Sequence, residues 1–406
     1  FGNVTVAAVT QDMEFAFDNI LYGTVQSGRN HGTSQGGFGT NTYLNADGTR
    51  LLVTDPLNYP SGRGRAYIYH LENGTWSLKQ TWDNPTNSGQ RFSDGACMNE
   101  DGTRVFLMHS EAEKVYTYEY ASGAWPTANT GTHVISPGNL GSLRLNLSCD
   151  KAGDVLLIVN GADGGVTSSI WRRTNATSWS QDTGGSFSSI NGGGCMNGDG
   201  TRAFLGQTSD STIRMTEWNG STWSSLTQII NSTGPEAMAC DSAGDTLIVN
   251  DAANSGIYER DSSDGSWSLT QAVTGSTEVY GTHQPSISYD GAMVLIGSQW
   301  YTGSVSQQGI GYLWTKSDGS WSLTKTYENP KTTPVAADYW GTGMGIARTS
   351  KDTFVIGMQG DDTAGTDYGS VYTYKQTPIL PSLSYGIPGT LAFHHGNFTS
   401  TDYSSA

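Results

Sequence analysis

One turn motif returns seven times along the chain, and its spacing constrains the fold more than any other feature. In its fullest form the motif reads Asn-x-Asp-Gly-Thr-Arg, and shorter versions retain only part of it. The seven turn positions are 45 to 61 residues apart, which is the period of blades in a β-propeller. The repeat therefore predicts seven blades. The turn positions are residues 47, 101, 153, 199, 244, 290 and 351.

Each copy has the same internal order of strand signals. A strand of small residues leads into the turn, and an apolar strand such as Leu51–Thr54 follows it. An alternating aromatic strand such as Ala66–Tyr69, a second turn and a strand led by tryptophan complete the copy. Asn-Gly and Asp-Gly supply the positive φ angles of tight hairpins, so the four strands are expected to pair antiparallel. The predicted fold is an all-β, seven-bladed β-propeller of four-stranded antiparallel blades. The leading tryptophans are Trp76, Trp125, Trp179, Trp223, Trp267 and Trp321.

The seventh copy lacks a tryptophan strand, so its blade needs a strand from elsewhere in the chain. Residues after Tyr374 run into prolines, which are unfavourable in a paired strand. Residues 14–19 resemble the strand ends at 81–85 and 326–330. We therefore predict that the N-terminal segment supplies the outer strand of the last blade and closes the ring. On this basis the chain divides into an N-terminal segment (1–37), the propeller (38–376) and a C-terminal tail that docks or tethers (377–406).

The fullest copies also carry residues typical of one repeat family. Phe38-Gly39 precedes the first turn, Gly64 and Tyr67 lie in the aromatic strand, and Trp76-Ser77-Leu78 follows the second turn. Tyr280-Gly281 and the residues after it repeat this order. The pattern resembles the FG-GAP repeat of integrin-like propellers and of many bacterial, phage and viral surface proteins. The resemblance implies a propeller in an extracellular or virion-surface setting.

FG-GAP repeats often carry a calcium loop of the form Asp-x-Asp-x-Asp-Gly, and this chain departs from that form. Its fullest turns, at 45–48, 99–102 and 197–200, hold only part of the ligand set. Calcium takes six or more oxygen ligands. We therefore predict structural turns and no cofactor, with weak calcium binding as the alternative.

Charge and motifs narrow the classes of function. The net charge of −16 argues against nucleic acid as a partner, because an acidic surface repels phosphate backbones. No run of 18 apolar residues is present, so no membrane span is predicted. The sequence contains no zinc-protease, nucleophile-elbow, Walker or dinucleotide motif. These observations favour a protein that is not an enzyme.

The four cysteines each precede a turn position by four residues. They are therefore predicted to occupy equivalent positions on the inner strands of blades 2 to 5. A disulfide or zinc site needs positions that converge, whereas a repeated buried position favours a small apolar side chain. We predict thiols that serve packing. These residues are Cys97, Cys149, Cys195 and Cys240.

Loop length differs between blades and indicates where a partner binds. The loops between the second and third strands are long in blades 1, 6 and 7, and so are the segments entering blades 7 and 1. These blades are ring neighbours, so their loops are predicted to merge into one raised sector. Exposed aromatic rings beside carboxylates can stack on sugars or anchor a protein partner; alternatively, the loops pack on each other or on a neighbouring subunit. The predicted contact residues are Tyr59, Trp300, Tyr301, Tyr339, Trp340, Tyr368, Asp361, Asp362 and Asp367.

Three hypotheses for function follow. The first is a non-catalytic propeller on a cell exterior or virus particle that binds a glycan or protein receptor. The second is a structural subunit or decoration protein of a particle or filament, whose raised sector contacts neighbouring subunits. The third is an enzyme with its site in the central channel.

Overall fold

A computed structural model describes most of the chain. Residues 15–375 form one compact unit, which holds nearly all of the seven sheets. The described residues contain strands, turns and bends but no helix. They are 13–23, 37–56, 63–86, 91–138, 140, 146–160, 167–232, 234–251, 255–273, 284–364 and 368–378.

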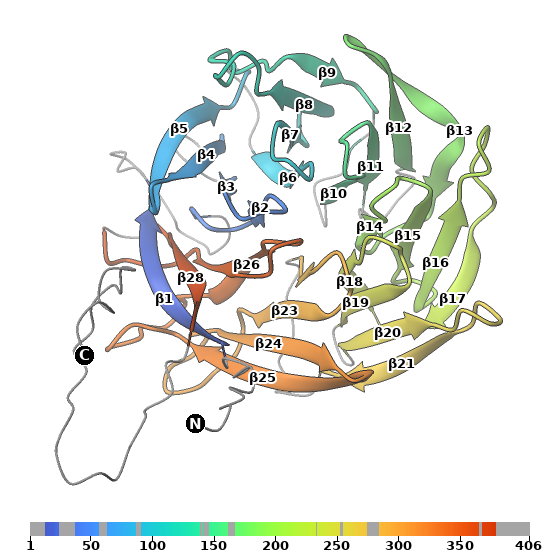
Figure 1. Ribbon diagram of the computed structural model, residues 1–406. Coiled ribbons are helices and arrows are strands. Elements are labelled where there is room, and N and C mark those ends of the chain that lie inside the picture. The colour runs from blue at the N-terminus through green and yellow to red at the C-terminus, as the bar shows by residue number, and fades with distance from the viewer. Residues whose placement is uncertain are drawn as a thin grey trace, which may run out of the picture. The chain divides into compact units, whose positions relative to one another are not determined.

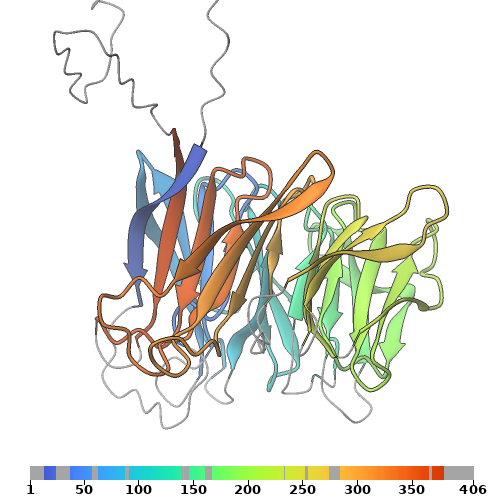
Figure 2. The ribbon, with the colours of Figure 1, turned by 90° about the horizontal axis from the view of Figure 1, so that it is seen from below.

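Seven four-stranded antiparallel sheets make up the propeller, which confirms the predicted fold class. Figure 1 shows the sheets arranged in a ring, with β2, β6, β10, β14, β18 and β26 nearest the centre in their blades. Figure 2 shows the blades from the side, with the strands running between two opposite faces of the ring.

The strands have the following bounds. Blade 1 consists of β2 (Thr42–Leu44), β3 (Arg50–Asp55), β4 (Arg65–Glu72) and β5 (Thr75–Asp83). Blade 2 consists of β6 (Phe92–Met98), β7 (Arg104–His109), β8 (Lys114–Glu119) and β9 (His133–Ile135). Blade 3 consists of β10 (Asn146–Cys149), β11 (Val155–Val159), β12 (Thr167–Asn175) and β13 (Ser178–Ser188). Blade 4 consists of β14 (Gly194–Met196), β15 (Arg202–Gln207), β16 (Thr212–Glu217) and β17 (Thr227–Asn231). Blade 5 consists of β18 (Pro235–Cys240), β19 (Thr246–Asp251), β20 (Gly256–Arg260) and β21 (Trp267–Ala272). Blade 6 consists of β22 (Ser286–Ile287), β23 (Met293–Ser298), β24 (Ile310–Ser317) and β25 (Ser320–Glu328). Blade 7 consists of β26 (Trp340–Ile346), β27 (Thr353–Met358), β28 (Ser370–Pro378) and β1 (Met13–Tyr22).

The N-terminal strand closes the last blade, as the sequence predicts. The strand order of blade 7 is β26-β27-β28-β1, so the outermost strand comes from the start of the chain. The Thr373 hydroxyl of β28 donates to Asp18 Oδ2 at 3.1 Å, and the Phe15 ring lies 4.8 Å from the Phe354 ring. Blade 7 therefore combines strands from both ends of the propeller, and this pairing closes the ring.

The repeated turns form a second closed ring, made of backbone hydrogen bonds. The Ala46 N–H donates to the Glu100 carbonyl at 2.8 Å, and equivalent bonds link each turn to the next one around the ring. The Thr349 N–H returns to the Ala46 carbonyl at 2.8 Å. Each turn therefore joins its own blade to its neighbour, which explains why the turn is the most repeated element of the sequence. The other links are Glu100 to Lys151, Lys151 to Gly198, Gly198 to Ser242, Ser242 to Tyr289 and Tyr289 to Arg348.

The repeated spacing of Asn and Arg in the turn motif has the same explanation. Asn197 Oδ1 accepts the Arg202 N–H at 2.8 Å and thereby shapes the turn within its own blade. The Arg202 guanidinium reaches the next blade, where Nη1 donates to the Gly244 carbonyl at 2.9 Å. Arg50 makes the same contact with Gly102 at 2.9 Å. The motif is thus an inter-blade clamp.

Apolar cores lie between neighbouring sheets. Leu52 and Ile68 of blade 1, for example, are completely buried in one cluster with Val105 and Leu107 of blade 2. Each sheet packs on a neighbour through both faces, so the second strand of a blade is apolar throughout instead of alternating.

The tryptophans of the outer hairpins each pack against the preceding blade. In even-numbered blades the indole N–H donates across that interface: Trp223 Nε1 of blade 4 reaches Asp182 Oδ2 at 2.9 Å, and Trp321 Nε1 of blade 6 reaches Glu259 Oε1 at 2.7 Å. In blade 1 the buried Trp76 packs on Val355 of blade 7, and its Nε1 has no partner among the described residues.

The prediction that tryptophan leads every outer strand is wrong for blades 2 and 4. β9 begins at His133 and β17 at Thr227, well after Trp125 and Trp223. Trp223 instead closes a short bridged turn and Trp125 directly follows one, and the side chains of both are anchored to the preceding blade.

Candidate functional site

The long loops of blades 6 and 7 meet, as the loop lengths predict. The β23–β24 loop runs beside the segment that enters β26, and three backbone hydrogen bonds of 3.1 Å join the two. Their donors are Ala337, Tyr339 and Trp340, and their acceptors are Ser306, Gln307 and Gln308. We call residues 299–309, 329–339 and 359–364 the blade 6–7 loop face. The corresponding loop of blade 1, with Tyr59, lies outside the described residues, as does Asp367.

An aromatic pair lies in this loop face. The rings of Trp300 and Tyr339 are 5.4 Å apart and meet edge to face at 81°. Tyr339 is 6% exposed, and its hydroxyl donates to Gln307 Oε1 at 3.2 Å. Trp300 is only partly buried, so solvent can reach its ring, which packs on the buried Tyr339.

The remaining predicted aromatic residues have different positions. Trp340 is completely buried, and its Nε1 donates to the Tyr327 carbonyl at 2.8 Å. The expectation that Trp340 is exposed is therefore wrong, because the residue begins the inner strand β26 and faces the interface between blades 6 and 7. Tyr301 and Tyr368 are partly buried, and Tyr301 packs on the core between blades 5 and 6.

Of the carboxylates predicted to contact a partner, one is buried and one is exposed among the described residues. Asp361 is completely buried and accepts hydrogen bonds from the hydroxyls of Thr363 and Ser370, both at 2.6 Å. The expectation of an exposed Asp361 is wrong, because this side chain organises its own loop. Asp362 is exposed.

Sequence reasoning missed a lysine that joins the loops. Lys331 Nζ lies 2.7 Å from Asp338 Oδ1 and 3.4 Å from Asp361 Oδ1, and both carboxylate side chains are 0% exposed. Burial alone would lower the pKa of Lys331, but the hydrogen bonds and charges of the two carboxylates outweigh burial and raise it. Lys331 thus ties the segment that carries Tyr339 to the β27–β28 loop. Lys331, Asp338 and Asp361 share no sequence motif, so no local signal indicates the cluster.

A second candidate site is a cavity of about 80 Å³ on the ring axis. Inner strands of six blades line it, and the Tyr43 hydroxyl of blade 1 donates across it to Gln284 Oε1 of blade 6 at 3.4 Å. The lining includes amides, hydroxyls, two thiols and the guanidinium of Arg348, but no carboxylate or imidazole among the described residues. Carboxylates and imidazoles are the usual groups of general acid–base catalysis.

Arg348 lines this cavity, and its carbonyl belongs to the ring of turns. Its Nε donates to the Ile287 carbonyl at 2.9 Å, and its Nη2 donates to the Cys240 carbonyl at 2.6 Å. The guanidinium carbon is 4.2 Å from the centre of the Tyr289 ring, and Lys151 Nζ is 4.6 Å from the same ring. Burial raises the pKa of Tyr289 to about 12, although the charge of Arg348 opposes the shift. The phenol is therefore neutral and packs against two cations.

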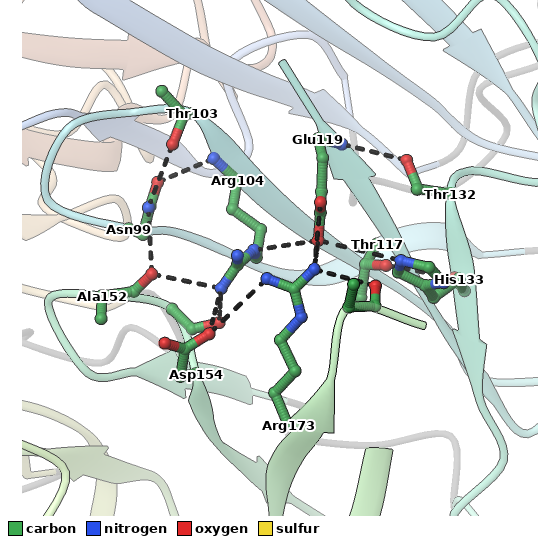
Figure 3. A network of polar contacts seen from close by, with 12 residues as sticks. Asn99, Thr103, Arg104, Thr117, Glu119, Thr132, His133, Ala152, Asp154 and Arg173 are labelled. Atoms are coloured by element: carbon green, nitrogen blue, oxygen red, sulfur yellow. Dashed lines mark hydrogen bonds and ion pairs between the residues drawn. The ribbon is translucent and has the colours of Figure 1, made fainter. Parts of the chain in front are cut away.

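A charged network joins blades 2 and 3 farther from the axis (Figure 3). Glu119 lies 3.2 Å from Arg104 Nε and 2.9 Å from Arg173 Nη2, and Arg104 Nη1 lies 2.7 Å from Asp154. Each charge has an opposite charge beside it, so this cluster is a brace between blades. Among the residues the structure describes, no group of three or more His, Cys, Asp or Glu is placed to hold a metal ion.

Comparison with known proteins shows a likeness of fold. No family model matches the chain, and no curated protein matches it. The β-propeller domain of Cps50 (Swd1) from Myceliophteria thermophila is similar over 90% of this chain and 100% of that domain, with 11% identity and a TM-score of 0.61. A protein from Lactobacillus plantarum (16% identity, TM-score 0.52) and a periplasmic gluconolactonase from Pseudomonas aeruginosa (14%, 0.50) each match 80% of this chain and 97% of their own.

These likenesses show a β-propeller and nothing finer, because identities this low carry fold alone. The resemblance to FG-GAP repeats stays a prediction. Among the described residues the structure has no helix that could span a membrane.

Proposed function

We propose that this propeller is a non-catalytic binding module that contacts a glycan or protein receptor through the blade 6–7 loop face. The observation that carries the proposal is the partly exposed Trp300 ring held edge to face on the buried Tyr339 ring. A fixed aromatic ring binds with little loss of side-chain entropy, because its orientation is set before the partner arrives. No metal or cofactor takes part in the proposed contact.

The loop face supports this role because it is braced from within. The Gln308 side chain is buried and accepts hydrogen bonds from the Ser304 N–H at 3.0 Å and the Ser304 hydroxyl at 2.9 Å. The ion pair between Lys331 and Asp338 fixes the neighbouring segment at 2.7 Å. A loop pair held in this way presents Trp300 in one position, which is what a binding surface requires.

The charge of the loop face favours neutral partners over acidic ones. Lys331 is neutralised by the buried Asp338 and Asp361, and the exposed Asp362 adds a negative charge. The chain as a whole carries −16. The proposed ligand is therefore a neutral glycan or a protein surface that is not acidic, in an extracellular or virion-surface setting.

Glycan-array binding with Trp300→Ala tests the proposal. We expect the variant to lose at least about tenfold in affinity for the glycans that the wild-type protein binds. Leu323→Ala is the matched control, because Leu323 is 43% exposed on the outer strand of the same blade and lies away from the loop face. Equal binding by wild type and Trp300→Ala, or turnover of a bound sugar, would contradict the proposal.

A further inference from the structure

The four cysteines lie at one register position on successive inner strands. Cys97 is opposite Phe106, Cys149 opposite Leu156, Cys195 opposite Phe204 and Cys240 opposite Leu247 in their respective sheets. The sequence predicts this equivalence, together with a packing role. Three of the thiols are buried and Cys149 is partly buried, and all four are unbridged.

The thiols meet in two pairs across blade interfaces, which the sequence did not indicate. Cys97 of blade 2 belongs to a buried core cluster against which Cys149 of blade 3 packs. Cys195 of blade 4 and Cys240 of blade 5 lie together in another buried cluster. The register that places each thiol on its own strand therefore also brings neighbouring thiols into contact.

Access from the axial cavity distinguishes the pairs. Cys97 and Cys149 both line the cavity, whereas Cys195 and Cys240 do not. Arg348 lies close enough to Cys195 to favour its thiolate, but burial outweighs that charge and raises the pKa of Cys195. Burial also raises the pKa of Cys97. Each pair thus contains one thiol whose pKa is raised by burial, and the difference between the pairs is the route by which a reagent arrives.

We propose that Cys97 and Cys149 form an oxidisable dithiol site, which a small disulfide oxidant reaches through the axial cavity and converts to a disulfide between blades 2 and 3. The pair Cys195 and Cys240 has the same arrangement without the cavity and stays reduced in the folded protein.

The reaction balances as two thiol–disulfide exchanges. The thiolate of one cysteine attacks a sulfur of oxidised glutathione, which forms a mixed disulfide and releases one glutathione. The second cysteine loses its proton and attacks the protein sulfur of that mixed disulfide, which releases the second glutathione. The protein loses two electrons and two protons, and the oxidant becomes two thiols. The product joins residues 52 positions apart in the chain and restricts the unfolded state.

The test is oxidation of the native full chain with oxidised glutathione at about pH 8.5, where the thiolate fraction is larger. Samples are quenched with acid, denatured and alkylated, and the remaining thiols are counted by mass spectrometry. We expect four free thiols to fall to two, with a cross-linked peptide that contains Cys97 and Cys149 and with Cys195 and Cys240 alkylated. The melting temperature should rise upon oxidation and return to its starting value after reduction.

Two controls make the result decisive. Cys195→Ser should leave the rate of cross-linking unchanged, whereas Cys97→Ser should abolish it and leave a glutathione adduct on the partly buried Cys149. Wild-type protein alone suffices if either variant folds poorly. A cross-link between Cys149 and Cys195, equal oxidation of both pairs, or four thiols that survive while the denatured chain oxidises would each overturn the proposal.

Discussion

The backbone N–H of Thr349 donates to the carbonyl oxygen of Ala46 at 2.8 Å, and this bond joins the seventh blade to the first. This bond completes a circle in which a backbone hydrogen bond links each turn to the next. The contacts between blades therefore repeat once per blade, and side chains such as Arg202 add further bonds across the same interfaces.

The circle of turn amides is expected to resist hydrogen exchange. The amides of residues 46, 100, 151, 198, 242, 289 and 349 each donate to the neighbouring blade, so they should open only when blades separate. We expect exchange at least about 100-fold slower than at Gly265, whose N–H bonds within a local hairpin turn at 2.8 Å. Hydrogen exchange followed by mass spectrometry measures this. Equal rates at Gly265 and Ser242 would show that the turns open independently.

Removal of an inter-blade clamp should cost more than removal of a surface ion pair. Arg202→Met loses the bond to the Gly244 carbonyl and the ion pairs with Asp245 and Glu217, and we expect it to lower the free energy of unfolding by about 1–2 kcal/mol. Arg214→Met is the control, because Arg214 pairs with Asp210 at the surface, at 3.2 Å and four residues away. That change should cost less than about 0.5 kcal/mol. Urea unfolding of both variants gives the comparison, and similar losses would argue against the clamp.

Removing the indole N–H should cost more stability where that N–H donates a hydrogen bond than where it has no partner among the described residues. Trp223→Phe removes a bond to Asp182, whereas Trp76→Phe removes an N–H that has no partner among the described residues. Both tryptophans are buried, at 3% and 6% exposure, so the loss of volume is similar. We expect Trp223→Phe to be the more destabilising by about 1–2 kcal/mol, measured by urea unfolding. The reverse order would mean that packing, not the hydrogen bond, sets the cost.

Asp94 should make stability depend on pH. Burial raises the pKa of Asp94 to about 6, although the nearby Arg91 opposes the shift. A folded pKa above the unfolded value of about 3.9 means that the contribution to stability is complete below about pH 4 and is lost as pH rises through 6. The side chain is 23% exposed, so the loss from pH 4 to pH 8 should be modest, about 1–2 kcal/mol. Asp94→Asn should lack this part of the pH profile. Parallel profiles for the two proteins would refute the shift.

Particular elements show how far sequence reasoning reached. The spacing of the turns predicted seven blades, and the likeness of residues 14–19 to outer-strand ends predicted the closing strand β1. Both are local patterns that recur along the chain, so comparing the copies within this single sequence is enough to detect them. The loop lengths likewise predicted that blades 6 and 7 meet, and the backbone bond between Tyr339 and Gln307 is one of the contacts that join them.

Other features depended on contacts between residues that are distant in sequence. Trp340 and Asp361 belong to the predicted set of contact residues together with Trp300 and Asp362, yet the first two are completely buried. Composition and spacing treat these residues alike, because burial depends on which neighbouring blade covers a side chain.

The sequence by itself determined the number of blades, their strand order and the way the ring closes, because each blade encodes its own hairpins and turn. Only the tertiary structure decided which aromatic ring of the blade 6–7 loop face reaches solvent and which thiols meet between neighbouring blades. Those properties belong to interfaces between blades, where residues distant in sequence, such as Trp300 and Tyr339, share one environment and where no short stretch of chain holds the information.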